Sequence, residues 1–425
     1  MKKYFILALS IILVGALFSQ DFDEAAMFAD TATVTEKSMA TDESILADEK
    51  KTGFSGTITS ALNVIFPKKD FDTPLSSPSL TADLFLDARL KGGIKGFISS
   101  EIVYVPKNDS ITLKLPEAFV DVNFNNKIYV RTGKQVLQWG RGQFWNPTDL
   151  INVERKKQDQ EIGLRNGTYG LKIHVPFGTK LNFYGFANMK NVDSLENTAG
   201  SFKTEFTVRA TEMAVGIWAK KNMQPVFSYD FSTALLGLNV AGEASLFRKD
   251  NENFASIIDD TLKIISGEKK WSSRAALTLN RSFNINGVPS RLNLAAEGFY
   301  NGTGYSIDFI ENAIKAKSEK PMFSPIEYAL ISGAYTPMQL SKYYVALFAT
   351  YNRFINSNMT LYVRIINNIE QQSALLYTYL VYTDLRDISI ALGASQGFGA
   401  KNSEFTLDMI PTSNLNVSLT ASISF

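Results

Sequence analysis

The feature that most constrains the fold of this chain is an alternation of apolar and polar residues with a period of two. Between Leu80 and Leu90 every second residue is Leu or Ala, and the residues between them are mostly charged. A period of two places successive side chains on opposite faces of a β-strand. A run of about ten residues is typical of a membrane-spanning strand with one face toward lipid, whereas strands in soluble β-sandwiches average about 5 to 6 residues. The length of the run therefore favours a transmembrane barrel over a sandwich.

The same alternation recurs along the chain. It is found from Ile94 to Tyr104 and from Arg291 to Tyr300. A further stripe, from Tyr343 to Tyr351, has a tyrosine at each end and aliphatic residues between them, as expected where aromatic girdles flank a hydrocarbon band. We therefore predict an all-β fold, a transmembrane antiparallel β-barrel of about sixteen strands, within a range of fourteen to eighteen. Sixteen is an even number, as single-chain bacterial barrels require.

The connections between the predicted strands test this interpretation independently, because such barrels alternate short turns at one end with longer loops at the other. Short turns are expected at Gly92, Asn125, 177–178 and 286–287, and the connections between them are mostly longer. Two places break the rule: 221–234 is long where a short turn is expected, and 371–372 is short where a loop is expected. An extra or missed strand pair could lie at these two places, so fourteen or eighteen strands remain open alternatives. The predicted strands are 54–66, 79–91, 93–105, 112–124, 126–138, 165–176, 179–189, 208–220, 235–248, 271–284, 289–301, 341–354, 358–370, 373–383, 387–396 and 414–425.

The N-terminal segment has the pattern of an export signal. Two lysines precede an apolar stretch from Tyr4 to Phe18, and polar residues follow it. This run is shorter than the roughly 20 apolar residues of a spanning helix, so residues 1–20 are predicted to be a signal peptide. Residues 21–52 are acidic and show no sustained period, which predicts a periplasmic arm, and 53–425 are predicted to form the barrel.

Composition argues against several functional classes. The chain has 43 basic and 42 acidic residues, so it has no electrostatic footprint for nucleic acid. It has no cysteine and a single histidine, His174, so thiolate chemistry is absent and a transition-metal site or a histidine-based hydrolase is disfavoured. We expect no enzymatic activity, no cofactor and no metal.

The C-terminal strand ends in Phe425 after a strict alternation. A terminal strand that ends in phenylalanine resembles the signal read by the outer-membrane barrel assembly machinery. That resemblance implies the outer membrane of a Gram-negative cell as the location, with membrane lipid and the assembly machinery as partners.

One segment carries a recognisable signature. The chain reads Gly-Lys-Gln at 133–135, Trp-Gly at 139–140 and Asn-Pro-Thr-Asp at 146–149. About twenty residues here resemble the strand-to-loop signature of a porin-like outer-membrane family that is similar to alginate-export and related substrate-channel barrels. The resemblance implies a channel, and a homotrimer is a reasonable expectation from it. The residues that carry it are Gly133, Lys134, Gln135, Trp139, Gly140, Asn146, Pro147 and Asp149.

The connection that follows the predicted strand 126–138, residues 139–164, is long and contains charges of both signs. It is either a constriction folded into the lumen, by analogy with general porins, or a solvated outer loop. We favour the constriction. The residues expected to line the pore or the constriction are Asp83, Asp87, Arg89, Glu117, Asp121, Arg131, Gln135, Arg141, Asp149 and Arg155, and Glu243 and Glu297 share the inward parity.

These observations predict a channel for passive diffusion of small polar or anionic solutes. Because both charge signs occur on the inward face, the lumen would orient polar solutes without excluding either ion sign. A transporter of hydrophobic compounds and a surface-exposed structural or adhesive barrel are the alternatives. The second alternative draws on the long connection 302–340, which contains a possible amphipathic helix at 307–316.

Overall fold

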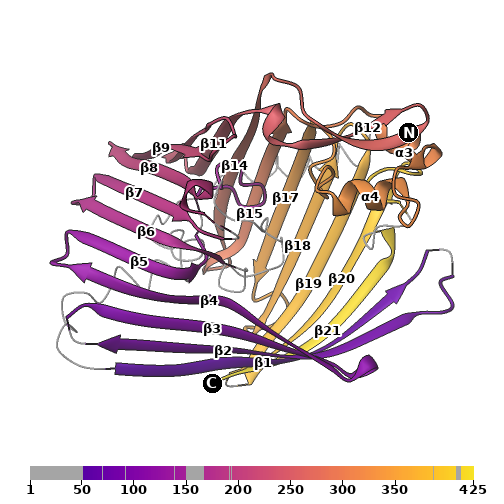
Figure 1. Cartoon of the computed structure of the whole chain (residues 1–425). Helices are drawn as coiled ribbons and strands as arrows, with labels where there is room; N and C mark the ends of the chain where they lie inside the picture. The colour runs from indigo at the N-terminus through magenta and orange to yellow at the C-terminus, as the bar shows by residue number, and fades with distance from the viewer. Residues whose placement is uncertain are drawn as a thin grey trace.

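The structure, a computed structural model, describes residues 51–425 except 69, 91, 138, 150–166, 191, 193, 386 and 408–412. The predicted signal peptide and arm lie outside the described residues, apart from Lys51 and Thr52, which belong to the first strand. Eighteen strands form one antiparallel sheet that closes on itself into a barrel (Figure 1). The predicted fold class is confirmed, with a strand count at the upper end of the predicted range.

Each barrel strand pairs with the next one along the chain. The strands are β1 (Lys51–Phe66), β2 (Leu75–Leu90), β3 (Ile94–Val105), β4 (Ser110–Phe124), β5 (Ile128–Gln135), β6 (Thr168–Phe177), β7 (Leu181–Asn188), β8 (Ala199–Val208), β9 (Thr211–Ala219), β10 (Val226–Leu235), β11 (Leu238–Arg248), β14 (Trp271–Ile285), β15 (Val288–Asn301), β17 (Tyr343–Asn352), β18 (Met359–Asn368), β19 (Ser373–Leu385), β20 (Ile388–Gly399) and β21 (Leu415–Ser424).

The barrel closes where β21 pairs with β1 over ten residues, from Thr57 opposite Ser424 to Phe66 opposite Leu415. Beyond the last strand residue, Phe425 exchanges two backbone hydrogen bonds with Gly56, of 2.9 and 3.0 Å. A closed sheet leaves no strand edge with unpaired backbone groups, which is the condition for a sheet to exist in lipid.

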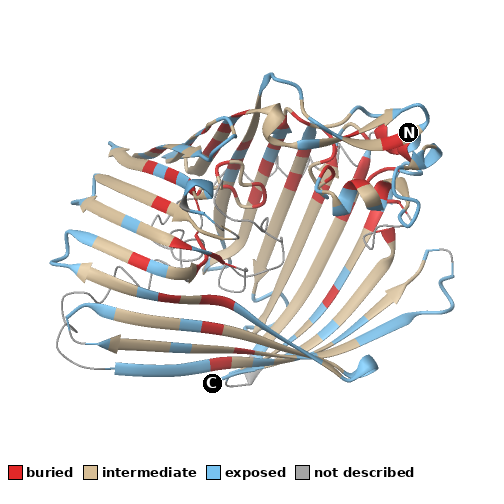
Figure 2. Cartoon of the chain, viewed as in Figure 1, coloured by how far each residue is buried: buried red, intermediate tan, exposed pale blue. Residues whose placement is uncertain are grey.

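The apolar face of the alternation points outward. Leu80 and Leu86 are 43% and 38% exposed, whereas Asp83 between them on the opposite face is 8% exposed. Along the strands the buried residues form short bands rather than a continuous layer between two sheets (Figure 2). This pattern excludes the soluble sandwich, whose apolar faces would meet in the middle, and it is the pattern of a membrane-spanning barrel.

Two barrel strands are absent from the predicted set. Apart from its last residue, Leu235, β10 lies within 221–234, where the connection rule already indicated a hidden strand, and its alternation of Phe227, Tyr229 and Phe231 with polar residues is clear. Apart from its last residue, Val208, β8 lies in the segment 190–207 that was assigned to a loop. Its outward positions include Gly200 and Thr204, so the apolar stripe is interrupted and the period is weak.

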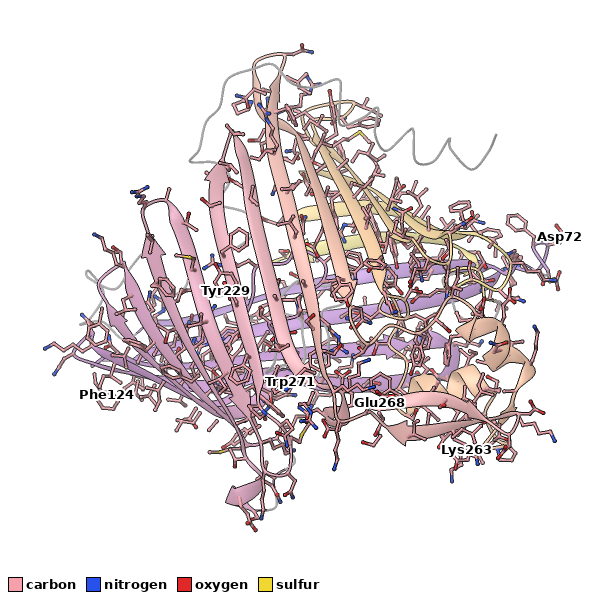
Figure 3. All side chains as sticks on the ribbon, turned by 90° about the horizontal axis from the view of Figure 1, so that it is seen from above. Asp72, Phe124, Tyr229, Lys263, Glu268 and Trp271 are labelled. Atoms are coloured by element: carbon pink, nitrogen blue, oxygen red, sulfur yellow. The ribbon has the colours of Figure 1, made fainter. Side chains whose placement is uncertain are left out.

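The connections are short at one end of the barrel and mostly longer at the other, as predicted. At the short end, Asn286 and Gly287 join β14 to β15 with positive φ values of 52° and 72°, as two-residue hairpin turns require. Figure 3 shows Phe124 at this end, with Asp72 and Lys263 at the opposite end. The tight connection at 371–372 is a true exception, because β18 and β19 pair directly up to Asn368 and Ser373.

At the long-loop end, a small cap packs on the barrel (Figure 1). It contains a three-stranded sheet and two helices that share a core including Leu262, Ile310 and Ala329. Helix α3 confirms the predicted helix, whereas α4 was not predicted although Ser324 and Glu327 form a capping box around its N-terminus. No helix of the described residues has the length and apolarity needed to cross a membrane. The bounds are β12 (Asn253–Ile258), β13 (Thr261–Ser266), β16 (Lys317–Ser318), α3 (Phe309–Lys315), α4 (Pro325–Ile331) and three short 3-10 turns, η3 (Pro106–Asn108), η5 (Leu195–Asn197) and η6 (Lys249–Asn251).

Candidate functional site

The chain leaves the barrel wall at the end of β5 and turns toward the interior. Glu117 on β4 accepts a hydrogen bond of 2.7 Å from the backbone N–H of Val136, the first residue after β5. Gln135 is fully buried and donates to the carbonyl oxygen of Gly170 on β6 at 3.2 Å. Trp139 then packs with Phe186 of β7 in a small apolar cluster. These contacts fix the direction in which the chain leaves the wall. Residues 139–149, which follow, are here called the inserted segment.

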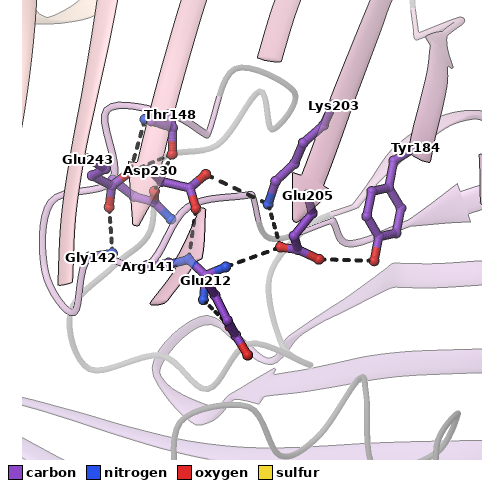
Figure 4. A network of polar contacts seen from close by, with 10 residues as sticks. Arg141, Gly142, Thr148, Tyr184, Lys203, Glu205, Glu212, Asp230 and Glu243 are labelled. Atoms are coloured by element: carbon purple, nitrogen blue, oxygen red, sulfur yellow. Dashed lines mark hydrogen bonds and ion pairs between the residues drawn. The ribbon is translucent and has the colours of Figure 1, made fainter. Parts of the chain in front are cut away.

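The inserted segment crosses to strands far from its origin. The guanidinium of Arg141 donates to Asp230 on β10 and Glu212 on β9, both at 2.7 Å, and to Glu205 on β8 at 3.3 Å (Figure 4). Lys203 on β8 lies 3.3 Å from Glu205 and 3.7 Å from Asp230. The result is a network of two cations and three carboxylates inside the barrel.

Further along, the inserted segment reaches β11 and β15. Glu243 on β11 accepts hydrogen bonds from the backbone N–H groups of Gly142 and Thr148, and Glu297 on β15 accepts from those of Gln143, Phe144 and Trp145. Both glutamates were predicted to face inward, but sequence reasoning did not connect them with this loop.

Aromatic packing accompanies these hydrogen bonds. Trp145 stacks on Phe299 of β15 with ring centroids 5.1 Å apart and planes 5° from parallel, and it also contacts Tyr344 of β17. Phe144 lies 6.0 Å from Phe348 of β17. The inserted segment is therefore held by both polar and apolar contacts to the wall opposite its root.

A second connection, residues 400–407, also turns inward, and sequence reasoning did not identify it. Its Glu404 is buried and accepts hydrogen bonds from the hydroxyl of Tyr344 at 2.7 Å and the side-chain amide of Asn368 at 2.8 Å. It also accepts from the backbone N–H of Met338 at 2.6 Å, and the carbonyl of Met338 accepts from the Trp145 indole at 2.9 Å. Burial raises the pKa of Glu404 above its usual value, against these hydrogen bonds.

The electrostatics of Arg141 follow from its surroundings. Its side chain is 19% exposed, and burial opposes its charge, but the hydrogen bond and the charge of Asp230 outweigh burial and raise its pKa. The side chain of Asp230 is 3% exposed, whereas that of Glu212 is 53% exposed. The network thus has a buried side at Asp230 and an open side at Glu212.

The predicted pore residues that belong to strands lie on β2, β4 and β5. Arg131 and Asp121 form a bidentate ion pair, in which Nε and Nη2 of the guanidinium lie 2.6 and 2.8 Å from the two carboxylate oxygens. The guanidinium carbon also lies 3.7 Å from the ring centroid of Phe119. Asp87 pairs with Arg89 and with Lys95. Asp83 and Glu117 are buried, as is Gln135.

The remaining residues of the signature are divided between β5 and the inserted segment. Gly133 and Lys134 are on β5, and Gly133 has a positive φ of 125°. Asn146 and Pro147 form a turn, because the backbone N–H of Asp149 donates to the Asn146 carbonyl at 3.1 Å. Arg155 lies outside the described residues.

The single histidine is part of an aromatic stack. His174 on β6 lies between Tyr129 and Tyr184, with centroid distances of 5.6 and 4.4 Å, and its Nε2 is 3.1 Å from the Asn182 side-chain oxygen. Across the part of the chain that the structure describes, no group of three His, Asp or Glu side chains is placed to hold a metal ion.

Comparison with known proteins gives a fold. No protein-family model and no curated protein sequence matches this chain. Among solved structures, OccAB1 of Acinetobacter baumannii superposes with a TM-score of 0.55 at 9% identity, covering 89% of this chain and 99% of that one. OccK2 (OpdF) of Pseudomonas aeruginosa, in complex with glucuronate, gives 0.53 at 9% identity with 88% and 98% coverage. OpdL of the same organism gives 0.52 at 10% identity with 88% and 99% coverage. The chain shares their barrel fold over nearly its whole described length.

Proposed function

We propose that this protein is an outer-membrane channel for passive diffusion of small polar or anionic solutes, with the inserted segment as its constriction. The observation that carries the proposal is the position of Arg141. The segment that contains it leaves the wall after β5, and its guanidinium donates hydrogen bonds to carboxylates on β8, β9 and β10. A loop exposed on the outside of the barrel would not make these contacts. They favour the constriction over a solvated outer loop.

The membrane location is supported by the outward apolar face. Exposed aliphatic residues on opposite sides of the barrel include Leu86, Ile217 and Leu392. Exposure of their apolar surface would cost free energy in water and none in lipid. We infer export through residues 1–20 and insertion by the barrel assembly machinery, with Phe425 as the recognised end. A homotrimer, and kinship with the alginate-export and related substrate-channel barrels on the signature at 133–149, belong to the same proposal.

The solute class is inferred from the charges of the inner wall. Arg141 lies beside three carboxylates, with Glu212 on its open side, so a polar solute would meet both charge signs at the inserted segment. A solved barrel of the same fold, OccK2, has been captured with glucuronate, a sugar acid. This supports small polar or anionic molecules as cargo and is the reason to test acids beside neutral sugars.

The experiment is reconstitution of the refolded chain in a planar bilayer and in liposomes. We expect discrete conductance steps, and swelling rates that fall with solute size for sugars and sugar acids. Arg141→Gln should shift the reversal potential in a salt gradient toward cation selectivity, because it removes a cation from the constriction.

Lys269→Gln, at an exposed position in the connection before β14, removes the same charge outside the barrel and should leave the reversal potential unchanged. A folded, inserted wild-type protein that conducts nothing would overturn the channel and favour the adhesive alternative, for which the folded cap of α3, α4 and β12–β13 offers a surface.

A further inference from the structure

We propose that Glu297 and Glu243 are positioning residues that set the width of the channel by binding the backbone of the inserted segment. The inference rests on the proposed function, because it assigns the residues that hold the constriction in place. These two side chains lie behind the segment, between it and the wall, and are 0% and 4% exposed. Neither is placed to contact a passing solute, so any effect they have on transport must act through the segment.

The carboxylate of Glu297 accepts hydrogen bonds from three consecutive backbone N–H groups. One carboxylate oxygen accepts from the N–H groups of Phe144 at 3.1 Å and Trp145 at 2.6 Å, and the other accepts from Gln143 at 2.7 Å. The hydroxyl of Thr278 on β14 donates to the second oxygen at 2.7 Å and anchors the carboxylate to the wall. A charged acceptor that meets several donors at once makes stronger hydrogen bonds than a neutral one.

Glu243 binds the segment at two further points. Its carboxylate accepts from the N–H groups of Gly142 and Thr148 and from the Thr148 hydroxyl. These donors lie on either side of the stretch bound by Glu297. The two carboxylates together accept five backbone N–H groups between residues 142 and 148, which fixes the course of the chain without relying on its side chains.

The sequence of the segment is adapted to this close approach. A Cβ atom at Gly142 would overlap the carbonyl oxygen of Trp145 and the carboxylate of Glu243. Gly140 has a positive φ of 99°, and a Cβ there would overlap Thr148 and the same carboxylate. The two glycines of the Trp-Gly-Arg-Gly run at 139–142 are therefore explained by the need to bring the backbone against Glu243, a role separate from recognition of a solute.

Substitutions in the Arg141 network and substitutions of Glu297 or Glu243 should change different properties of the channel. The Arg141 network has an open side at Glu212, so its charges act on ions in the lumen. Glu297 and Glu243 lie behind the segment and act on its position. Loss of one charge-assisted hydrogen bond shifts the equilibrium between docked and undocked segment by about tenfold to a hundredfold. We therefore expect their removal to widen the channel and increase current fluctuation with little change in ion selectivity.

The test compares Glu297→Gln and Glu243→Gln with wild type in single-channel recordings and in liposome swelling with sugars of increasing size. An amide keeps the size of the side chain but turns one acceptor into a donor that faces backbone N–H groups. We expect larger or more frequently fluctuating conductance and passage of larger sugars, while the reversal potential stays near the wild-type value. Glu101→Gln on β3, which pairs with Lys114 away from the segment, is the matched control and should keep the wild-type size limit.

A second variant guards against failure of the wall variants to fold. Thr148→Val removes one hydroxyl donor to Glu243 from the segment itself and leaves the barrel strands unchanged. It should produce a weaker form of the same widening. If wild type conducts but folded Glu297→Gln, Glu243→Gln and Thr148→Val all keep its size limit and current noise, the positioning role is wrong. If wild type itself does not conduct, the proposed function has failed first.

Discussion

The two sides of the barrel interior differ in kind. The wall from β8 to β15 carries Lys203, Glu205, Glu212, Asp230, Glu243 and Glu297, and the inserted segment is bound to it. The wall around the seam is neutral, since β20 and β21 contain no Asp, Glu, Lys or Arg, and the only one in β1 is its first residue, Lys51. At the seam, Thr57 and Thr59 hydrogen bond to Ser424 and Ser422 at 3.1 and 2.9 Å.

This difference indicates how one barrel can serve two purposes. The charged wall orders a loop inside the lumen, which requires strong and specific acceptors. The seam presents hydroxyl groups that pair with each other and bear no charge. In the proposed channel, selectivity and pore width are thus set on one side, and the other side provides a polar surface that is indifferent to ion sign.

The largest effect is expected from a substitution that adds a side chain at Gly142, where the segment lies against the charged wall. Gly142→Val has no space for its Cβ, so the segment should leave the charged wall, with a stability loss of about 1 to 3 kcal/mol for an overpacked site. Conductance and the sugar size limit should both rise. Gly298→Ala on β15, where an added Cβ meets nothing within 4 Å, is the control, and equal behaviour of the two variants would contradict the docking.

A smaller effect is expected from Asp230→Asn. It removes the buried carboxylate that binds Arg141 at 2.7 Å and weakens a charge-assisted hydrogen bond that contributes roughly 1.5 to 3 kcal/mol. With one negative charge fewer, the reversal potential should shift toward anions, opposite to Arg141→Gln. The same shift from Ser422→Asn, a substitution of comparable polarity at the seam, would show that the two walls do not differ.

The buried Glu404 predicts a pH dependence. Its pKa is raised by burial, so the ionised form costs stability, and that cost is absent below the unfolded pKa and complete above the folded one. Thermal stability should therefore increase as pH falls through the folded pKa of Glu404. Glu404→Gln should flatten this part of the profile in detergent melts, and an unchanged profile would mean that Glu404 does not titrate in the folded protein.

The smallest effect is expected at the seam. Thr59→Val removes one hydroxyl hydrogen bond, to Ser422, and should cost only about 0.5 to 1.5 kcal/mol. Because no charge changes, reversal potential and size limit should both stay at wild-type values. A change of ion selectivity in this variant would contradict the comparison, because it would mean that the neutral seam also sets selectivity.

Much of the fold was predictable because the period of two is a local property of each strand. The face of Leu80 and Leu86, the turn at Asn286 and Gly287, and helix α3 followed from short stretches of sequence. β8 was missed because Gly200 and Thr204 interrupt its outward stripe. Such interruptions carry no local signal that distinguishes a strand from a polar loop.

The site was less predictable, because its contacts join distant residues. Arg141 was selected as a charged residue of the long connection 139–164, but its partner Asp230 lies 89 positions away on a strand that was not predicted. Glu243 and Glu297 had the correct inward parity, yet their ligands are backbone N–H groups, which have no sequence signature. The inward turn of 400–407 depends in the same way on Tyr344 and Asn368 of other strands.

The most direct test of the central claim is a single-channel recording of a variant in which residues 141–148 are replaced by a short Gly-Ser linker. The account predicts that wild type conducts in discrete steps, and that the folded variant conducts more and admits larger sugars, because the constriction has been removed. Equal conductance and equal size limit in the two proteins would contradict the claim that this segment narrows the channel.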